Sequence, residues 1–305
     1  MSALPHVLML FLDGVGIGKK DSSINPFFAS RFIALEEFMG GSIPNLRERY
    51  SSTAAGSMVP LSATLQMPGL PQSGTGQTAL LTGKNAPKII GKHFGPYPYS
   101  TLRPLLTEEN IFKKLQLHHK RVLYANAFPQ RYFDYFGQHK SRMTAIAYAW
   151  EQSGNKLNDA EVLKSGKALS ADITNEHWNK LGFTPVPVIT LHDAGKRLVD
   201  LTSQYDFVFY EYYMTDKTGH SQSMPDALHV LGMLDGLLEG ILQSFRHESM
   251  LLLITSDHGN MEDLSTKSHT RNPVPLVAYG KEHKKITSKS KNIMHVTPAI
   301  LELLK

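Results

Sequence analysis

The sequence predicts an α/β protein whose central sheet is mostly parallel. Three apolar runs have the length and composition of buried strands, at residues 7–12, 206–213 and 251–254. Helical patterns lie between them, most clearly over residues 190–202 and 225–245. Each apolar run ends in polar or glycine residues, and open α/β sheets hold their ligands at the carboxyl ends of the strands. We therefore expect a functional site where these runs end.

The rest of the chain extends this pattern. A further strand is expected over residues 121–126, and an apolar segment over 272–278; residues 58–66 give no prediction. Other helices are expected over residues 27–38, 77–81, 110–117, 143–152, 159–167 and 296–304. Aromatic residues mark a change of character near residue 128. We predict a single domain over residues 1–305, with a small, mostly helical insertion at 128–185 that covers a site.

The composition is that of an ordinary soluble globular protein, with 41% apolar and 19% charged residues. No apolar run approaches the roughly 20 residues that span a bilayer. The amino end lacks a basic region before its apolar run, which ends in Asp13, so we expect a first strand and no signal peptide. The chain has no cysteine, so any metal ligands are oxygen or imidazole nitrogen. A cytoplasmic location is expected.

The net charge of +5 raises the question of nucleic acid. The basic residues are scattered, however, and the densest run, 281–291, has no interleaved aromatic residues. A solvated loop is the simpler interpretation of that run. We expect no nucleic-acid partner, and a positive field that favours a small anionic substrate.

Six candidate metal ligands share carboxylate or imidazole chemistry, and most follow a predicted strand. They are Asp13, Asp216, His220, Asp257, His258 and His269. Each has a structural alternative, because a lone aspartate often opens a turn. Together they form two sets of N and O ligands. Two divalent ions about 4 Å apart can activate a hydroxyl and stabilise a leaving oxygen.

Ser73 is the candidate for that hydroxyl. It precedes a predicted helix, where it is either an N-cap or a nucleophile beside the helix dipole.

Three common nucleotide-binding and hydrolase motifs do not fit the sequence. Lys19 stands where a dinucleotide fingerprint needs its third glycine, and Pro71 stands where Gly-x-Ser-x-Gly needs its first. The spacing between Gly76 and Gly83 is too long for a Walker motif.

The segment 84–98 is punctuated by glycine and proline. Its basic residues predict either a phosphate-binding rim or a plain surface loop; the candidate substrate-binding residues are Lys84, Lys92 and His93. Other histidines are expected on the surface: His118, His119, His139 and His177.

These motifs resemble those of the alkaline phosphatase superfamily. Asp257-His258-Gly259-Asn260, followed by His269, is most similar to cofactor-independent phosphoglycerate mutase, with phosphopentomutase a further relative. Leu12-Asp13-Gly14 is similar to the strand that opens the mutase chain. Ser73 falls where the mutase has its nucleophile, in Asn-Ser-x-x-Gly-His, and Asp216 and His220 match its Asp-x-x-x-His element.

The resemblance implies a three-layer α/β/α sandwich and two divalent ions, zinc or manganese. One ion would be held by Asp216, His220 and His269. The other would be held by Asp13, Asp257 and His258, with Ser73 bridging to it. By this analogy the second ion lowers the pKa of Ser73, the alkoxide attacks phosphorus to give phosphoserine, and the first ion stabilises the leaving oxygen.

Two departures from the mutase pattern shape the functional prediction. Gln77 replaces the motif histidine, and only about 140 residues separate Ser73 from Asp216, where the mutase carries a large phosphotransfer domain. We predict a phosphatase that acts on a small phosphate ester. The alternatives are a phosphodiesterase, a non-catalytic metal-binding protein, or a phosphomutase. A mutase would need phosphate-holding residues in the insertion, where Arg131, Lys140 and Arg142 are the basic cluster. A sulfatase is unlike this sequence, because Ser73 lies outside a Cys/Ser-x-Pro-x-Arg setting.

Overall fold

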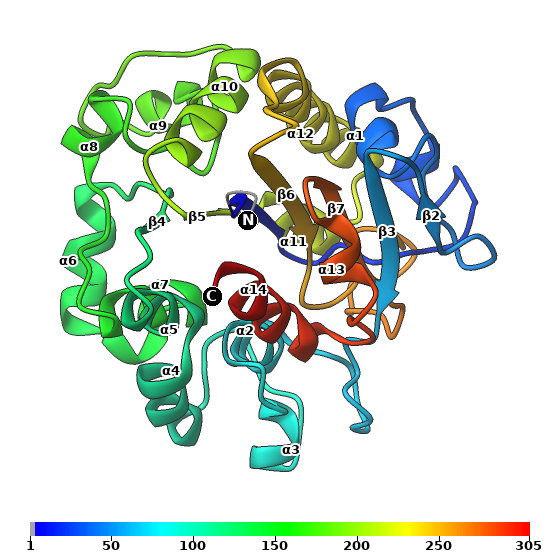
Figure 1. The fold of residues 1–305 in the computed structure, drawn as a ribbon, viewed down its shortest axis with the longest axis horizontal. Coiled ribbons are helices and arrows are strands. Elements are labelled where there is room, and N and C mark those ends of the chain that lie inside the picture. The colour runs from blue at the N-terminus through cyan, green and yellow to red at the C-terminus, as the bar shows by residue number, and fades with distance from the viewer. Residues whose placement is uncertain (1–3) are drawn as a thin grey trace.

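The computed structural model describes residues 4–305, and a seven-stranded sheet runs through its centre (Figure 1). The order of the strands is β2-β3-β7-β6-β1-β5-β4. Their bounds are β1 (His6–Leu12), β2 (Ser51–Ser52), β3 (Gly56–Leu61), β4 (Val122–Tyr124), β5 (Phe207–Tyr212), β6 (Met250–Thr255) and β7 (Val274–Gly280).

Four neighbouring strands, β4, β5, β1 and β6, are parallel to one another. Strand β7 runs antiparallel to both β6 and β3. The predicted α/β fold with a mostly parallel sheet is therefore confirmed. Strand β3 was not predicted, since Pro60 interrupts its apolar pattern, as a proline can in a strand near the sheet edge.

Strand β1 is buried on both faces of the sheet, which explains its unbroken apolar sequence. Its residues alternate between two cores: Phe11 faces one with Leu253 of β6, and Leu12 faces the other with Ile254. Burying each such side chain contributes about 1.5–3 kcal/mol. By the same alternation Asp13 projects to the side of Phe11.

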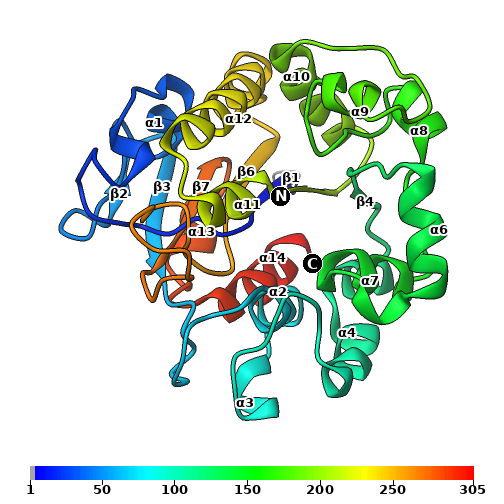
Figure 2. The ribbon, with the colours of Figure 1, turned by 180° about the vertical axis from the view of Figure 1, so that it is seen from behind.

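Helices cover both faces, as Figures 1 and 2 show from opposite sides. The Phe11 face packs against α2 (Ser73–Thr82), α4 (Arg103–Glu109), α5 (Ile111–Leu117), α7 (Ala145–Gln152) and α14 (Val296–Leu304). The Leu12 face packs against α1 (Ile33–Phe38), α10 (Leu191–Thr202) and α12 (Met224–Ser244). The remaining helices are α3 (Ala86–Ile90), α6 (Gln130–Gln138), α8 (Ala160–Lys164), α9 (Glu176–Lys180), α11 (Met214–Ser221) and α13 (His283–Thr287), with 3-10 turns η1 (Pro26–Phe28), η2 (Ser100–Leu102), η3 (Lys140–Arg142) and η4 (Ile293–His295).

Residues 128–185 are mostly helical, but they divide into parts with different surroundings. Helix α7 belongs to the main core, where Ile146 and Trp150 are buried. Helices α8 and α9 pack around a separate small core that includes Leu163 and Trp178. Aromatic side chains of α6, including Phe136, also pack against the main core. A cap over the site therefore remains a prediction for α8 and α9, whereas α6 and α7 lie against the main core.

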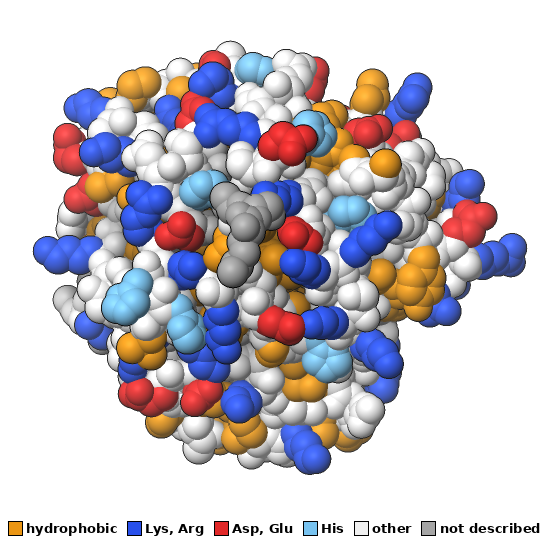
Figure 3. Space-filling view, viewed as in Figure 1, with side chains coloured by type: hydrophobic (Ala, Val, Ile, Leu, Met, Phe, Trp, Pro, Cys, Tyr) orange, Lys and Arg blue, Asp and Glu red, His pale blue; other side chains and the backbone are white. Residues whose placement is uncertain are grey.

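Charged side chains are interspersed over the surface. On the face in Figure 3, lysine and arginine side chains alternate with acidic ones, without a continuous basic stripe. Among the described residues 4–305, no helix is long and apolar enough to cross a membrane.

Candidate metal centre

All of the predicted ligands lie at one edge of the sheet. Strands β5, β1 and β6 are adjacent and parallel, so their carboxyl ends lie side by side. Asp13 directly follows β1, Asp216 lies in the first turn of α11 after β5, and Asp257 follows β6. The amino end of α2 brings Ser73 to the same place.

The first group surrounds the imidazole of His258. Its Nε2 atom lies 3.3 Å from Asp13 Oδ1, 3.6 Å from Asp257 Oδ2 and 2.9 Å from Ser73 Oγ. Asp257 and His258 are completely buried, and Ser73 and Asp13 are almost so. The hydroxyl is therefore held inside the ligand cluster, with little access to water.

The second group joins α11 to the loop after β6. His220 Nε2 lies 3.3 Å from Asp216 Oδ2 and 3.2 Å from His269 Nε2, and His269 Nε2 lies 3.6 Å from Asp216 Oδ1. Each histidine uses Nδ1 to bind a backbone carbonyl, His220 that of Lys267 and His269 that of Pro71. A carbonyl only accepts, so Nδ1 carries the hydrogen and the lone pair of each Nε2 faces the other ligands.

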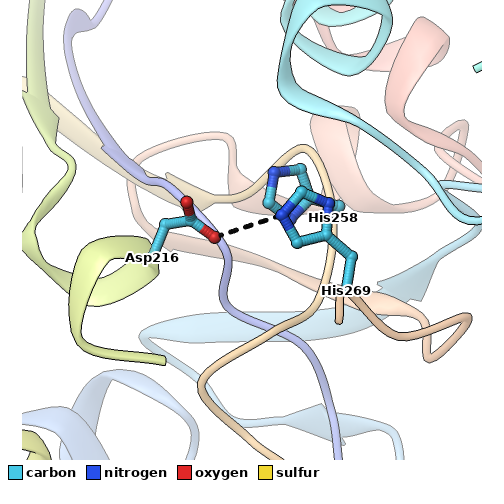
Figure 4. A group of neighbouring side chains, drawn as sticks. All are labelled: Asp216, His258 and His269. Carbon is cyan, nitrogen blue, oxygen red and sulfur yellow. Dashed lines mark ion pairs between the residues drawn. The ribbon is translucent and has the colours of Figure 1, made fainter. Parts of the chain in front are cut away.

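The two groups share a boundary at His258. Its ring stacks on that of His269, with centroids 3.8 Å apart and planes 16° from parallel. Asp216 also lies close enough to His258 and His269 for the three to hold one ion (Figure 4). The sequence assigned His258 to the Asp13 and Asp257 set alone, whereas the geometry also brings it to Asp216.

Buried charges shift the pKa values of these groups. Burial, and then the charge of Asp13, raises the pKa of Asp257 well above its ordinary value. Burial lowers the pKa of His258, but the carboxylates of Asp257 and Asp13 outweigh it and raise that pKa to about 10. Burial and the neighbouring His258 lower the pKa of His269 to about 4.

The first group has the donor atoms that a divalent cation requires. Asp13 Oδ1 and both carboxylate oxygens of Asp257 are buried without a hydrogen-bond partner, and Nε2 of His258 faces them. Unpartnered buried charges are costly, and a bound cation would neutralise the carboxylates. Carboxylate and imidazole donors suit zinc or manganese. The residues present therefore fit the implied metals.

Ser73 is held beside His258 because the start of α2 packs closely against neighbouring segments at two glycines. Ser73 is the first helical residue, and the N-cap is Gln72, whose side chain makes no capping bond. The N-cap interpretation of Ser73 is thus wrong, because its hydroxyl faces His258 instead. A Cβ at Gly74 would overlap the carbonyl oxygen of Tyr97, and one at Gly76 would lie 3.0 Å from Asp257 Cβ. Glycine is therefore required at Gly74, and at Gly76 a side chain would press on Asp257.

Two polar residues beside the ligands were given no role from the sequence. Gln77 is buried and donates from Nε2 to Asp13 Oδ2 at 3.3 Å. Asn260 donates from Nδ2 to Asp216 Oδ1 at 2.7 Å. Their positions, one helical turn after Ser73 and two residues after His258, are the signal that could have identified them.

The three predicted substrate-binding residues lie in two places. Lys84 follows the carboxyl end of α2, a helix about 15 Å long, so the structure does not bring it to Ser73. Lys92 lies over the rings of Phe94 and Tyr99, and Phe94 O accepts from the backbone N–H of Thr75. The segment that contains Lys92 and His93 therefore contacts the start of α2.

Four other histidines are exposed, as predicted: His118, His119, His139 and His177.

The fold is that of alkaline phosphatase. The alkaline phosphatase from the Antarctic bacterium TAB5 superposes with a TM-score of 0.57 at 13% identity, covering 100% of this chain and 99% of that one. The PH0037 protein from Pyrococcus horikoshii superposes with a TM-score of 0.61 at 14% identity, covering 100% and 98%.

Residues 5–305 match the Metalloenzyme superfamily, and the chain belongs to that family. It is 30% identical over 128 residues to the 2,3-bisphosphoglycerate-independent phosphoglycerate mutase of Antithamnion sp.. That match covers 39% of this chain and 25% of the mutase. The chain is 32% identical over 108 residues to that of Ehrlichia canis (strain Jake), 33% of this chain and 21% of the mutase. The resemblance to the alkaline phosphatase superfamily near this mutase is confirmed, and the chain spans about a quarter of these relatives.

Proposed function

We propose that this protein is a metal-dependent phosphoryl-transfer enzyme, and that its reaction is hydrolysis of a small phosphate ester through phosphoserine at Ser73. The observation that carries the proposal is the position of the Ser73 hydroxyl, 2.9 Å from His258 Nε2 inside a cluster of unpartnered carboxylate oxygens. Family membership supports metal dependence. Similarity to mutases and phosphatases supports phosphoryl transfer.

The protein groups supply position and electrostatics. Asp13, Asp257 and His258 would hold one ion and Asp216, His220 and His269 the other; when bound, such ions favour a serine alkoxide and offset the charge of a leaving oxygen. Ser73 Oγ loses its proton to water and forms the bond to phosphorus while the bond from phosphorus to the ester oxygen breaks, and that oxygen leaves as the alcohol after taking a proton from water. Water then releases phosphate from Ser73. A phosphoryl group on Ser73 would lie at the amino end of α2, where the helix dipole favours negative charge.

Lys92 and His93 are the proposed contacts for the rest of the substrate. The segment that carries them contacts α2 near Ser73, and an ammonium group there would attract a second anionic group. We leave Lys84 out of this proposal, because it lies beyond the opposite end of α2.

A phosphomutase is the second candidate, since the similar curated sequences are mutases. That reaction must retain the phosphoryl group near a second holding site. The basic residues Lys140 and Arg142 lie in η3, where Arg103 also binds the carbonyl of Ser141. Isomerised product without free phosphate would favour the mutase.

The test is a panel of phosphomonoesters and phosphodiesters with added zinc or manganese, using wild type and Ser73→Ala. The expected result is phosphate release that falls at least about 10³-fold in the variant. Ser57→Ala is a matched control. Ser57 lies on β3, away from the centre, is as buried as Ser73, and its Oγ lies 2.9 Å from Nδ1 of a histidine, His283. Equal loss in both variants, or metal binding without turnover of any ester, would contradict the proposal.

A further inference from the structure

Glu262 is a buried carboxylate with an unusually complete set of hydrogen bonds. Its side chain accepts at Oε2 from the backbone N–H groups of Gly16, at 2.9 Å, and Asn260, at 2.8 Å. It accepts at Oε1 from the hydroxyl of Thr270, at 2.5 Å, and the amide of Asn272, at 3.0 Å. It is 1% exposed. Glu262 belongs to neither ligand group, so these bonds need another explanation.

The four donors come from the three segments that carry metal ligands. Gly16 lies three residues after Asp13, and Asn260 lies two after His258. Thr270 follows His269 directly. One carboxylate thus ties together the loops after β1 and β6 and the later loop of His269. Backbone bonds also join these segments in pairs, from Met261 N–H to Gly14 O and from Thr270 N–H to Gly259 O, whereas Glu262 contacts all three at one side chain.

The packing around Glu262 leaves no space for another arrangement. A Cβ at Gly16 or at Gly259 would overlap Glu262 Oε1. A Cβ at Gly18 would lie 2.7 Å from the backbone oxygen of Glu262 and 2.9 Å from its Cγ. The glycines therefore allow two ligand loops to close onto the same carboxyl group.

We propose that Glu262 is a positioning residue: it sets the distances among the ligand loops before a metal binds. The inference rests on the proposed metal centre but not on the proposed reaction. Removing a residue that orients metal ligands commonly weakens metal affinity by about 10- to 100-fold. Glu262 is in neither ligand group and acts through the segments that carry Asp13, His258 and His269.

The chemistry of the donors predicts a graded response to substitution. The two backbone N–H groups at Oε2 can only donate, so an oxygen is required there. The Thr270 hydroxyl can rotate and the Asn272 amide can turn, so both can accept from an amide nitrogen. Glu262→Gln should therefore preserve most of the arrangement. Glu262→Ala removes it, and Glu262→Asp is too short to reach both sides.

The experiment measures affinity for Zn²⁺ and Mn²⁺ by chelator competition, and the absorption spectrum with Co²⁺ in their place. Glu262→Ala should lose about 10- to 100-fold in affinity with an altered cobalt spectrum. Glu262→Gln should stay within about fivefold of wild type, which is less than the smallest loss expected for the alanine variant. In metal-free protein, hydrogen exchange should rise in residues 13–18 and 257–272 of the alanine variant.

Controls separate positioning from general destabilisation. Leu115→Ala creates a cavity beneath α5 in the core on the Phe11 face, whereas Val15 and Met261 of these loops lie in the other core, so it should lower stability while keeping metal affinity. If Glu262→Ala does not fold, Thr270→Val removes one hydroxyl with little change in volume and should weaken metal affinity several-fold. Wild-type affinity and spectrum in the folded alanine or valine variant would overturn the proposal, and so would a wild type that binds no metal. Wild-type metal binding without ester turnover would contradict only the proposed function.

Discussion

His258 and Ser73 meet across two elements that are 185 residues apart in the sequence, with Nε2 and Oγ separated by 2.9 Å. His258 follows the central strand β6 and Ser73 begins the buried helix α2. Neither group has an alternative partner in solvent, because both are buried. The pair therefore defines where the proposed nucleophile and the proposed metal ligands join.

Removing one ligand set should lower the metal content by one ion. His220 belongs only to the set with Asp216 and His269, whereas His258 lies between both sets. We expect two equivalents of zinc or manganese in wild type, one in His220→Ala and at most one in His258→Ala. Metal analysis after gel filtration measures this. Two tightly bound equivalents in the His220 variant would contradict the assigned ligand set.

The buried carboxyl of Glu211 should make stability depend on pH. Burial raises its pKa from 4.5 to about 7, against the lowering effect of the bond from Tyr124. The folded state then binds more protons between pH 4.5 and 7, so this group's contribution is present below pH 4.5 and is lost as pH rises through 7. The shift corresponds to about 3 kcal/mol.

Glu211→Gln removes that titration while keeping an acceptor for Tyr124. We expect the free energy of unfolding of the variant, relative to wild type, to increase by about 3 kcal/mol from pH 4.5 to pH 8. Denaturant titrations in the presence of a chelator measure the difference. A difference that does not change with pH would contradict the assignment.

Gly74 should be intolerant of a side chain because the chain around Tyr97 lies against it. Gly74→Ala should destabilise the protein by about 1–3 kcal/mol and lower turnover by displacing Ser73. Gly137→Ala is the control, since a Cβ there meets nothing within 4 Å, and it should leave activity unchanged. Wild-type stability and activity in the Gly74 variant would show that the contact with residue 97 is unimportant.

Lys92 and Lys84 should differ in their effect on substrate binding. Lys92→Ala should raise KM about two- to fivefold with little change in kcat, as expected for an exposed ion pair worth about 0.5–1 kcal/mol. Lys84→Ala should change neither value, because Lys84 lies past the far end of α2. Steady-state kinetics on the best ester distinguishes them. A KM that is unchanged in both variants would place both lysines outside the substrate site.

Much of the fold was readable from the chain because the central strands are buried on both faces. Strands β1, β5 and β6 appear as apolar runs that stop at polar residues, and the helix predicted over residues 296–304 matches α14. Strand β3 was missed because its pattern is interrupted by Pro60. A strand near an edge tolerates such residues, and so it gives a weaker signal.

The ligand residues were predictable as types and positions, but their pairing was not. Spacing shows that Asp216 and His220 lie four residues apart, on one side of α11. It does not show that His258 stacks on His269, since this depends on the course of the loop after β6. The contacts of Gln77 and Glu262 depend on packing between distant segments, which spacing alone does not encode.

The most direct test of the central claim is to identify the phosphorylated residue. Metal-loaded protein would be quenched with acid during turnover and its peptides analysed by mass spectrometry. The proposed function predicts phosphate on Ser73 in wild type and in Ser57→Ala, and none in Ser73→Ala. Phosphate on a different residue, or no phosphorylated residue in an enzyme that is turning over its ester, would contradict it.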